Sequence, residues 1–321
     1  MLLVILEHEN GQLVEAAREA LTFGRVLAKK MGEDLEAAII GSDDDDLVEA
    51  AGQYGAETVH TVTHDLLTDY GPDAFGSVIA QMVESLDPDA VLSCGSDRAN
   101  EFMANAAARL DAPFVANCTD VNPGDTWAMT RIQWGGSLLE DATLTADVPL
   151  LTCGLHAVAA EIGDEEDAVA EEFDVDLDES FTITMVKDRV VQEAGVTLPT
   201  AAVVVGGGRG VGSEDGFGQL EELANLLGGR VGCSRAVTNL GWRPHADQVG
   251  QTGTRIAPEI YIASGISGAI QHWVGAMASK HILAINTDKE ANMVTKADWA
   301  VIGDLHEVIP AIIAEVQSRK G

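Results

Sequence analysis

The 321-residue chain is strongly acidic, since 52 Asp and Glu stand against 19 Lys and Arg and give a formal net charge of −33. Because phosphates and anionic lipid headgroups would be repelled, this charge excludes a nucleic-acid partner and argues against binding to an acidic membrane surface. A hydrophobic content of 46% excludes a disordered acidic chain, and the length suffices for two domains with separate cores.

Residues 1–110 alternate strand-like and helix-like stretches. Short apolar runs predict strands at 2–6, 37–40, 58–62 and 90–94. Helical periodicity and acidic first turns predict helices over 12–31, after the acidic run 43–46, over 72–86 and over 97–110. This alternation indicates a parallel sheet wound with helices.

Residues 111–189 read as a shorter, β-rich region, with turns expected at Pro123-Gly124 and Gly135-Gly136. Residues 161–180 hold eleven carboxylates and no basic residue, which predicts a solvated loop. Strand and helix signals resume after Pro199, so the boundary between two domains is placed within 187–199. The sequence therefore predicts one domain over residues 1–190 and a second over residues 191–321.

The second series opens with an apolar strand that feeds the glycine-rich turn 206–210, followed by a helix over 217–227. Outward-pointing backbone N–H groups and the charge of Arg209 would suit a pyrophosphate there. The turn is not a GxGxxG motif, because Val211 stands at a glycine position. The next strand ends in Ser234 and Arg235 instead of the acid that holds an NAD ribose, which argues against a dehydrogenase. By itself the turn fits a phosphate cradle and a packing turn equally well.

The run 249–272 is the most informative stretch of the chain. Its glycines allow close approach of a flat ligand, and the hydroxyls of Thr252, Ser264 and Ser267 with the His272 imidazole supply hydrogen bonds without fixed charge. Ser267 is expected to begin a helix, whose free N–H groups favour an electron-rich ligand edge. The alternative is a strand-turn-helix that needs its glycines only for packing.

These motifs resemble, in order and spacing, the flavin-binding domain of the electron transfer flavoprotein alpha subunit. They are GGGRG at 206–210, GCSRA at 232–236, the run VGQTGTRIAPEIYIASGISGAIQH at 249–272, AIN at 284–286 and DL at 304–305. The resemblance covers residues 200–321. It implies an α/β fold with a C-terminal FAD-binding, Rossmann-like parallel domain behind an N-terminal domain like the adenine nucleotide alpha hydrolases.

The resemblance also implies roles for individual residues. Arg235 would place positive charge beside a reduced flavin, Thr252 would bond the flavin N5, and His272 would bond the pyrimidine end near O2. From the residues alone, a surface ion pair, a turn-stabilising threonine and a structural histidine stay open as the alternatives. The other implied cofactor contacts are Arg209, Ser234, Val249, Gly250, Gln251, Ser267, Gly268, Ala269, Ile270, Gln271, Asn286, Asp304 and Leu305.

Partners follow from the same resemblance. It implies a heterodimer with an electron transfer flavoprotein beta subunit that holds AMP or a second FAD. The complex would take electrons from flavin dehydrogenases, such as the acyl-CoA dehydrogenases of fatty acid beta-oxidation, and pass them to a membrane quinone oxidoreductase. The chain would thus be an electron carrier and not an enzyme, with bifurcation left open. The alternatives are a stand-alone nicotinamide- or flavin-dependent oxidoreductase and a scaffold subunit without cofactor.

Cysteine and histidine spacing predicts no metal site and reduced thiols. Met1 leads directly into an apolar strand, and no apolar run reaches membrane-spanning length, so a cytoplasmic chain without a signal peptide is expected.

We interpret the negative charge as the solvated surface of a halophile's protein, with a charged docking patch as the alternative. The low number of lysines, seven against twelve arginines, also favours the halophile interpretation. After the strand 90–94, Ser96 and Asp97 are expected to cap a helix, with anion binding as the alternative.

Overall fold

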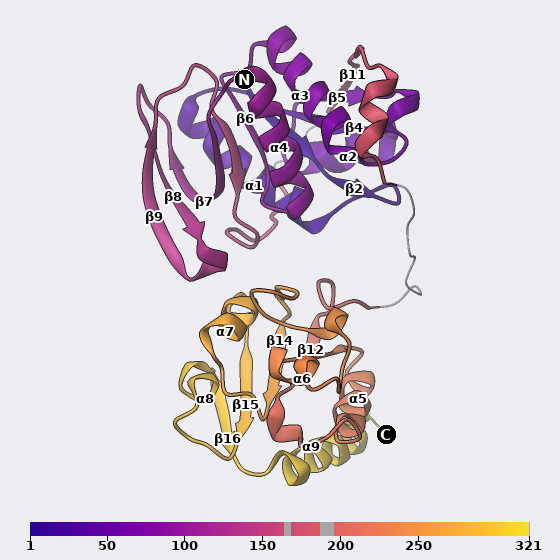
Figure 1. The fold of residues 1–321 in the computed structure, drawn as a ribbon, viewed down its shortest axis with the longest axis vertical. Helices are drawn as coiled ribbons and strands as arrows, with labels where there is room; N and C mark the ends of the chain where they lie inside the picture. The colour runs from indigo at the N-terminus through magenta and orange to yellow at the C-terminus, as the bar shows by residue number, and fades with distance from the viewer. Residues whose placement is uncertain (164–167, 187–195, 321) are drawn as a thin grey trace. The chain divides into compact units, whose positions relative to one another are not determined.

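The computed structural model describes residues 1–163, 168–186 and 196–320 (Figure 1). The chain divides into two compact units, Met1–Gln133 with Leu138–Val190, and Trp134–Ser137 with Val191–Gly321. The predicted boundary between residues 190 and 191 falls outside the described residues and stays a prediction. Both units are α/β, as the sequence predicts.

The first unit is built on a nine-stranded sheet in the order β11-β5-β4-β1-β6-β10-β7-β8-β9. The central strand β1 (Leu2–Leu6) is fully buried and lies parallel to both neighbours. The other parallel strands are β4 (Leu35–Ile40), β5 (Thr58–Val62), β6 (Ala90–Cys94), β10 (Leu150–Cys153) and β11 (Val169–Glu172). The last three strands are β7 (Phe114–Asn122), β8 (Trp127–Gln133) and β9 (Leu138–Leu144). β7 is parallel to β10 and antiparallel to β8, and β8 is antiparallel to β9.

Four long helices belong to this unit: α1 (Glu15–Met31), α2 (Asp45–Gln53), α3 (Pro72–Leu86) and α4 (Asp97–Leu110). Their ends follow local chemistry. Pro72 opens α3, where its missing N–H costs nothing, and the Ser96 hydroxyl caps α4 by accepting from the Ala99 N–H at 2.9 Å. Gly32 ends α1 in the left-handed region with φ 75°. The expectation of a helix-capping role for Ser96 is confirmed.

Two expectations for the first unit are wrong. The first helix begins at Glu15 and not at residue 12, because β2 (His8–Glu9) and β3 (Gln12–Leu13) pair as a hairpin. Asn10 and Gly11 turn this hairpin with φ of 52° and 72°, values that Asn and Gly tolerate. Part of the acidic run 161–180 also forms a strand: β11 is exposed along its length, yet its backbone pairs with β5.

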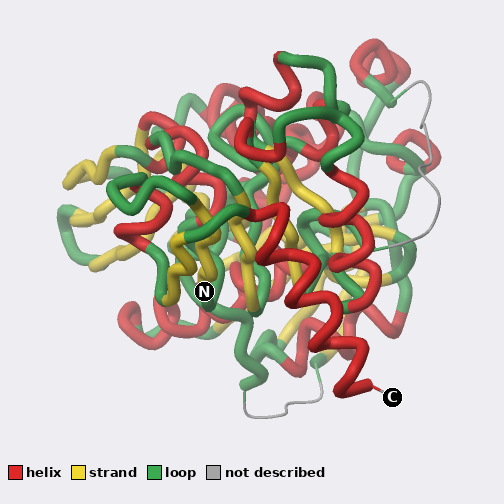
Figure 2. The backbone as a smooth tube through the Cα atoms, turned by 90° about the horizontal axis from the view of Figure 1, so that it is seen from below, coloured by secondary structure: helices red, strands yellow, loops and turns green. Residues whose placement is uncertain are grey.

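The second unit contains a five-stranded parallel sheet in the order β13-β12-β14-β15-β16. Its strands are β12 (Val203–Gly207), β13 (Arg230–Cys233), β14 (Ile260–Ser264), β15 (Ile282–Asn286) and β16 (Trp299–Ile302). Its helices are α5 (Phe217–Leu226), α6 (Arg235–Asn239), α7 (Ile270–Ala276), α8 (Asn292–Lys296) and α9 (Leu305–Lys320). Figure 2 shows α9 running to the C-terminal end of the chain.

Alternating residues of β14 serve two separate cores. Ile262 packs with residues of α5 and α9 on one face, whereas Tyr261 and Ala263 pack with residues of α7 and α8 on the other. This alternation is the two-residue period of a strand buried on both faces. Helices cover both faces of the sheet, which is the parallel α/β domain that the sequence predicts.

Candidate functional site

The carboxyl ends of the second sheet carry most of the predicted site residues. Gly207 and Ser264 end the neighbouring strands β12 and β14 in register. Ser234 follows β13 directly, Asn286 is the last residue of β15, and Asp304 comes two residues after β16. The strand order reverses between β12 and β14, and open α/β sheets bind ligands outside the carboxyl ends at such a point. The topology thus gathers these positions along one edge.

The glycine-rich turn after β12 is a packing turn. The Gly208 N–H donates to the Ser264 carbonyl at 2.9 Å, and the Gly210 N–H donates to the Gly265 carbonyl at 3.1 Å. A Cβ on Gly208 would lie 2.2 Å from the Gly265 oxygen, so this contact requires glycine. The N–H groups of Gly208 and Gly210 are therefore engaged within the domain and do not point outward to a pyrophosphate, as in the packing turn that the sequence left open. The Arg209 side chain between them stays exposed.

The loop 249–252 is held against α7. The Gln251 N–H donates to the Gln271 carbonyl at 2.7 Å. Gly250 adopts φ 146°, and a Cβ on Gly275 would lie 2.4 Å from the Gly250 nitrogen, so two glycines allow the loop to touch the helix. The structure therefore brings together the two segments in which the sequence placed most of the expected contacts.

A buried glutamine orients the Thr252 hydroxyl. Gln248 is 2% exposed; its Oε1 lies 2.8 Å from the Thr238 hydroxyl, and its Nε2 donates to Thr252 Oγ1 at 3.0 Å. Because the Thr252 oxygen accepts this bond, its own O–H is left to donate to a further acceptor. Sequence reasoning missed Gln248, whose partners lie ten residues before it and four residues after it.

His272 is a buried, neutral imidazole. Its Nε2 lies 2.8 Å from the Tyr261 hydroxyl, and its side chain is among the least exposed polar groups of the unit. Burial lowers the pKa of His272 to about 4, with the Val249 backbone acting in the opposite direction. Nδ1 makes no hydrogen bond of normal geometry among the described residues, nor does the buried Ser264 hydroxyl. Native proteins leave few buried polar atoms unpaired, so both need an explanation.

The segment before His272 differs from the expected helix. Helix α7 begins at Ile270 and not at Ser267, because Gly268 adopts φ 74° and a Cβ there would lie 2.3 Å from the Met293 nitrogen. The Asn286 amide donates to the Ile266 carbonyl at 3.0 Å and so fixes the start of this loop. The free N–H groups expected at the start of this helix therefore belong to the first turn of α7, from Ile270, and not to a turn begun at Ser267.

Charged residues along the edge fall into two groups. Arg209 and Arg235 are exposed, and neither forms an ion pair within the described parts of the chain. Asp304 accepts from the His306 N–H at 2.9 Å and starts α9, while Leu305 is buried in the apolar core. The surface ion pair considered for Arg235 is thus not found there, whereas Asp304 and Leu305 have clear structural roles.

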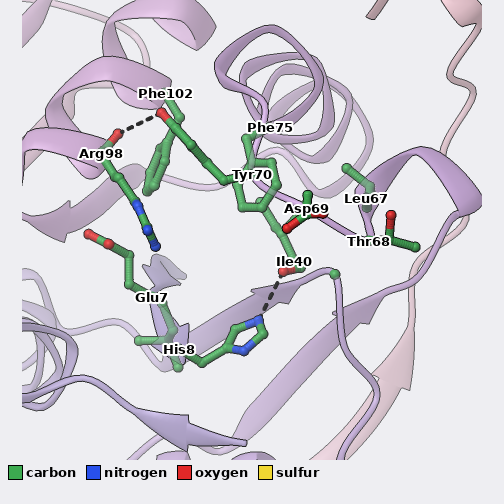
Figure 3. Close-up of a pocket in the computed structure, with 12 residues that line it drawn as sticks. Glu7, His8, Ile40, Leu67, Thr68, Asp69, Tyr70, Phe75, Arg98 and Phe102 are labelled. Carbon is green, nitrogen blue, oxygen red and sulfur yellow. Dashed lines mark hydrogen bonds between the residues drawn. The ribbon is translucent and has the colours of Figure 1, made fainter. Parts of the chain in front are cut away.

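A cavity of about 90 Å³ in the first unit is a second candidate, and Figure 3 shows its lining. It lies at the carboxyl end of β1, where the Arg98 side chain points toward Glu7 (Figure 3). Ser96 and Cys94 donate to Glu7, and Arg98 pairs with Glu9 at 3.0 Å. The Ser96 hydroxyl thus bonds a carboxylate, which leaves no place for the anion considered there.

The described residues offer neither a cluster of metal ligands nor a membrane-spanning helix. Within the described residues, no group of three or more His, Cys, Asp or Glu is placed to hold a metal ion. All four cysteines are buried and free. No helix in the described part of the chain is long and apolar enough to span a membrane.

Comparison with known proteins agrees with this geometry. Residues 197–277 match the family profile described as electron transfer flavoprotein FAD-binding domain, and residues 2–178 match electron transfer flavoprotein domain. Electron transfer flavoprotein subunit alpha of Thermoanaerobacterium thermosaccharolyticum is 34% identical over 99% of this chain and 98% of its own length. The subunits alpha of Mycobacterium leprae (35%, 99% of each chain) and Bacillus subtilis (34%, 98% of this chain and 96% of its own) are similarly close. The chain therefore belongs to the electron transfer flavoprotein alpha subunit family.

Proposed function

We propose that this chain binds one FAD along the carboxyl edge of its second sheet and carries electrons as the alpha subunit of a heterodimer. The observation that supports this most strongly is the unpartnered, buried Nδ1 of His272 beside the loop that holds Thr252. A buried polar atom without a partner costs about 1–3 kcal/mol, and a ligand edge with carbonyl and ring-nitrogen groups would satisfy it. Bound FAD supplies the reversible acceptance of electrons, which no side chain here can provide.

The side chains of this edge suit the parts of such a cofactor. The Thr252 hydroxyl, oriented by Gln248, has its O–H free for the flavin N5. Neutral His272 offers a ring nitrogen to the pyrimidine end near O2 without a competing charge. Arg235 and Arg209 are the positive groups for a reduced flavin and for phosphate oxygens. The tuning of the flavin potential is assigned to Arg235, Thr252 and His272.

The remaining contacts form two short stretches and a strand-end group. The first stretch is the loop 249–252 and the second is 267–272, which precedes and enters α7. Ser234, Asn286, Asp304 and Leu305 complete the proposed binding edge. For Asn286, Asp304 and Leu305 the contribution is to shape the loops and the start of α9, since their side chains are already engaged.

The partners proposed are those of an electron carrier. The relatives are named subunit alpha, which supports pairing with a beta subunit that would hold AMP or a second FAD. Flavin dehydrogenases, including acyl-CoA dehydrogenases of fatty acid beta-oxidation, would donate electrons in the cytoplasm, and a membrane quinone oxidoreductase would accept them. A stand-alone nicotinamide enzyme is not favoured, because Ser234 follows β13 where a ribose-binding acid would stand.

Cofactor analysis tests the proposal. The chain is co-expressed with its beta subunit, purified at high salt and assayed for FAD and AMP after denaturation. One FAD per heterodimer is expected, and Arg235→Ala with Thr252→Val should reduce its retention during dialysis. Arg98→Ala, which removes an arginine from the cavity of the first unit, is the matched control and should retain FAD. A colourless complex that cannot be reconstituted with FAD would overturn the proposal.

A further inference from the structure

Tyr261 and His272 form an isolated buried pair in the second unit. Tyr261 lies on β14 with no exposed surface, and His272 lies on α7. The phenol oxygen is 2.8 Å from Nε2, and the ring centroids are 6.0 Å apart at 32°. The contact is therefore a hydrogen bond through the ends of the two side chains and not a stacked pair.

The bonding around the pair selects one tautomer of the imidazole. Within the described residues the Tyr261 hydroxyl makes a single hydrogen bond, to Nε2. If Nε2 carried the proton and donated, the buried phenol O–H would lack an acceptor and Nδ1 would be an unpaired acceptor as well. If the phenol donates to Nε2, only the N–H on Nδ1 remains unpaired. The second arrangement leaves fewer buried groups without a partner.

The protonation state of the phenol agrees with this arrangement. Burial raises the pKa of Tyr261 well above its usual range, so the phenol keeps its proton at every pH at which the fold is stable.

The neighbouring strand makes room for this phenol. A Cβ on Gly206 would lie 2.3 Å from the Tyr261 oxygen and 2.5 Å from its ring. Gly206 is the register partner of Ala263, two residues beyond Tyr261, so the ring extends along the sheet toward its carboxyl edge. The first glycine of the GGGRG motif thus leaves the space that the Tyr261 ring occupies.

We infer that Tyr261 is a positioning residue that holds His272 as the Nδ1–H tautomer, so that the imidazole presents a hydrogen-bond donor to the electron-rich edge of the flavin. The presentation to flavin rests on the proposed function, whereas the Tyr261–His272 bond does not. A donor at this point favours a flavin that gains negative charge on reduction, without adding a positive charge to the site.

Nitrogen NMR of the histidine ring tests the tautomer directly. The full chain with its beta subunit, labelled with ¹⁵N-histidine and freed of FAD, is compared with its Tyr261→Phe variant, and His272→Asn identifies the signal. In the wild type, coupling from the ring C–H protons should show a protonated Nδ1 and an unprotonated Nε2. Tyr261→Phe should lower the fraction protonated at Nδ1 at least twofold. Tyr70→Phe, which removes a phenol bonded to Glu101 in the first unit, should leave the signal unchanged.

The outcomes separate this inference from the proposed function. The positioning role of Tyr261 would be overturned if wild-type His272 is protonated at Nε2, or if the Tyr261→Phe variant gives the same signal as the wild type. The measurement on the wild type is decisive even if the variant fails to fold. FAD is then added to the wild-type complex. A shift of the Nδ1 signal on addition of FAD supports both proposals. If the Nδ1–H tautomer is confirmed but its signal does not change when FAD binds, only the contact between His272 and the flavin is contradicted.

Discussion

The two sheets of this protein both end in polar side chains, yet their electrostatic surroundings differ greatly. Residues 1–190 carry 39 Asp and Glu against 9 Lys and Arg, a net charge of −30. Residues 191–321 carry 13 against 10, a net charge of −3. Nearly all of the excess charge therefore belongs to the first region, and a cofactor that carries phosphates would meet far less repulsion beside the second sheet.

The polar groups at the two edges also differ in how they are satisfied. In the first sheet the buried Ser93 hydroxyl donates to the Ile5 carbonyl at 2.8 Å, and Thr152 donates to Asn100 at 2.8 Å. In the second, Ser264 and the Nδ1 of His272 have no partner among the described residues. Polar residues at strand ends thus identify a binding edge only when some of their buried atoms are left for a ligand.

The largest effect that would sharpen this comparison concerns His272 and pH. The pKa of His272 is about 4 in the folded protein against an ordinary 6.5, so the unfolded chain binds the proton first as the pH falls. The neutral His272 side chain therefore contributes fully to the free energy of unfolding above pH 6.5. This contribution, about 3 kcal/mol in total, is lost as the pH falls from 6.5 to 4. Hydrogen exchange in β14 of the FAD-free protein should show this loss, and His272→Gln should reduce it.

Exposed His245 of the same unit provides the control, because His245→Gln removes an imidazole without opening the core. The wild-type and His272→Gln proteins should differ in the pH dependence of β14 protection, and the difference should be absent from β1. If the wild-type and His272→Gln proteins give identical curves, the fold does not hold His272 neutral. The carboxyl edge of the second sheet would then not differ in this respect from that of the first sheet.

The second effect is that of salt. At 0.1 M salt charges interact over about 10 Å, and near 1 M over about 3 Å, so repulsion within the first region should be screened as KCl is added. Amide protection in β1, β4 and β6 should rise at least tenfold, or ~1.4 kcal/mol, between 0.1 and 2 M KCl, with a much smaller change in β12 and β14. An equal change in both sheets would break the comparison, and no change in either would refute the halophile interpretation.

Much of the fold is readable from the sequence where local chemistry decides it. The strands Thr58–Val62 and Ala90–Cys94 and the helices Pro72–Leu86 and Asp97–Leu110 have their predicted ends. A proline at the first helical position, a serine cap and apolar periodicity fix these ends locally. The insertion of β10 between β6 and β7 and the recruitment of β11 from an acidic run depend on pairing between distant segments, which periodicity does not encode.

The candidate site could likewise be predicted only in part. Motif order placed Thr252 and His272 beside one another, but the residues that orient them, Gln248 and Tyr261, were missed because their roles depend on single side-chain contacts. For the glycines of the first turn the sequence leaves a phosphate cradle and a packing turn equally open, because it shows that a residue lacks a Cβ but not which atoms a Cβ would contact. Gly208 is explained by the backbone of Gly265, which lies 57 residues away.

The third effect concerns Arg235 once FAD is bound. If the guanidinium favours reduced over oxidised flavin by ~1.4 kcal/mol, Arg235→Ala should lower the one-electron midpoint potential by about 60 mV, a tenfold change in the equilibrium. Redox titration of the heterodimer measures this potential. Arg98→Ala, in the cavity of the first unit, should leave it unchanged. If both variants leave the potential unaltered, the Arg235 guanidinium does not tune the flavin.

The smallest effect is the most direct comparison of the two edges, because one substitution should have opposite signs in the two sheets. Ser93 and Ser264 are both fully buried near the ends of parallel strands. Ser93→Ala removes a hydrogen bond and leaves the Ile5 carbonyl short of a donor, so the free energy of unfolding should fall by ~1 kcal/mol. Ser264→Ala removes a hydroxyl that has no partner among the described residues, so the FAD-free protein should become more stable by ~1 kcal/mol.

Urea unfolding of both variants without FAD measures the signs of the two changes in the free energy of unfolding. If FAD then satisfies the Ser264 hydroxyl, the gain should disappear in the loaded heterodimer, whereas the loss from Ser93→Ala should remain. If both substitutions destabilise the FAD-free protein, the buried polar groups at the edge of the second sheet have hydrogen-bond partners within the protein, as those of the first sheet do.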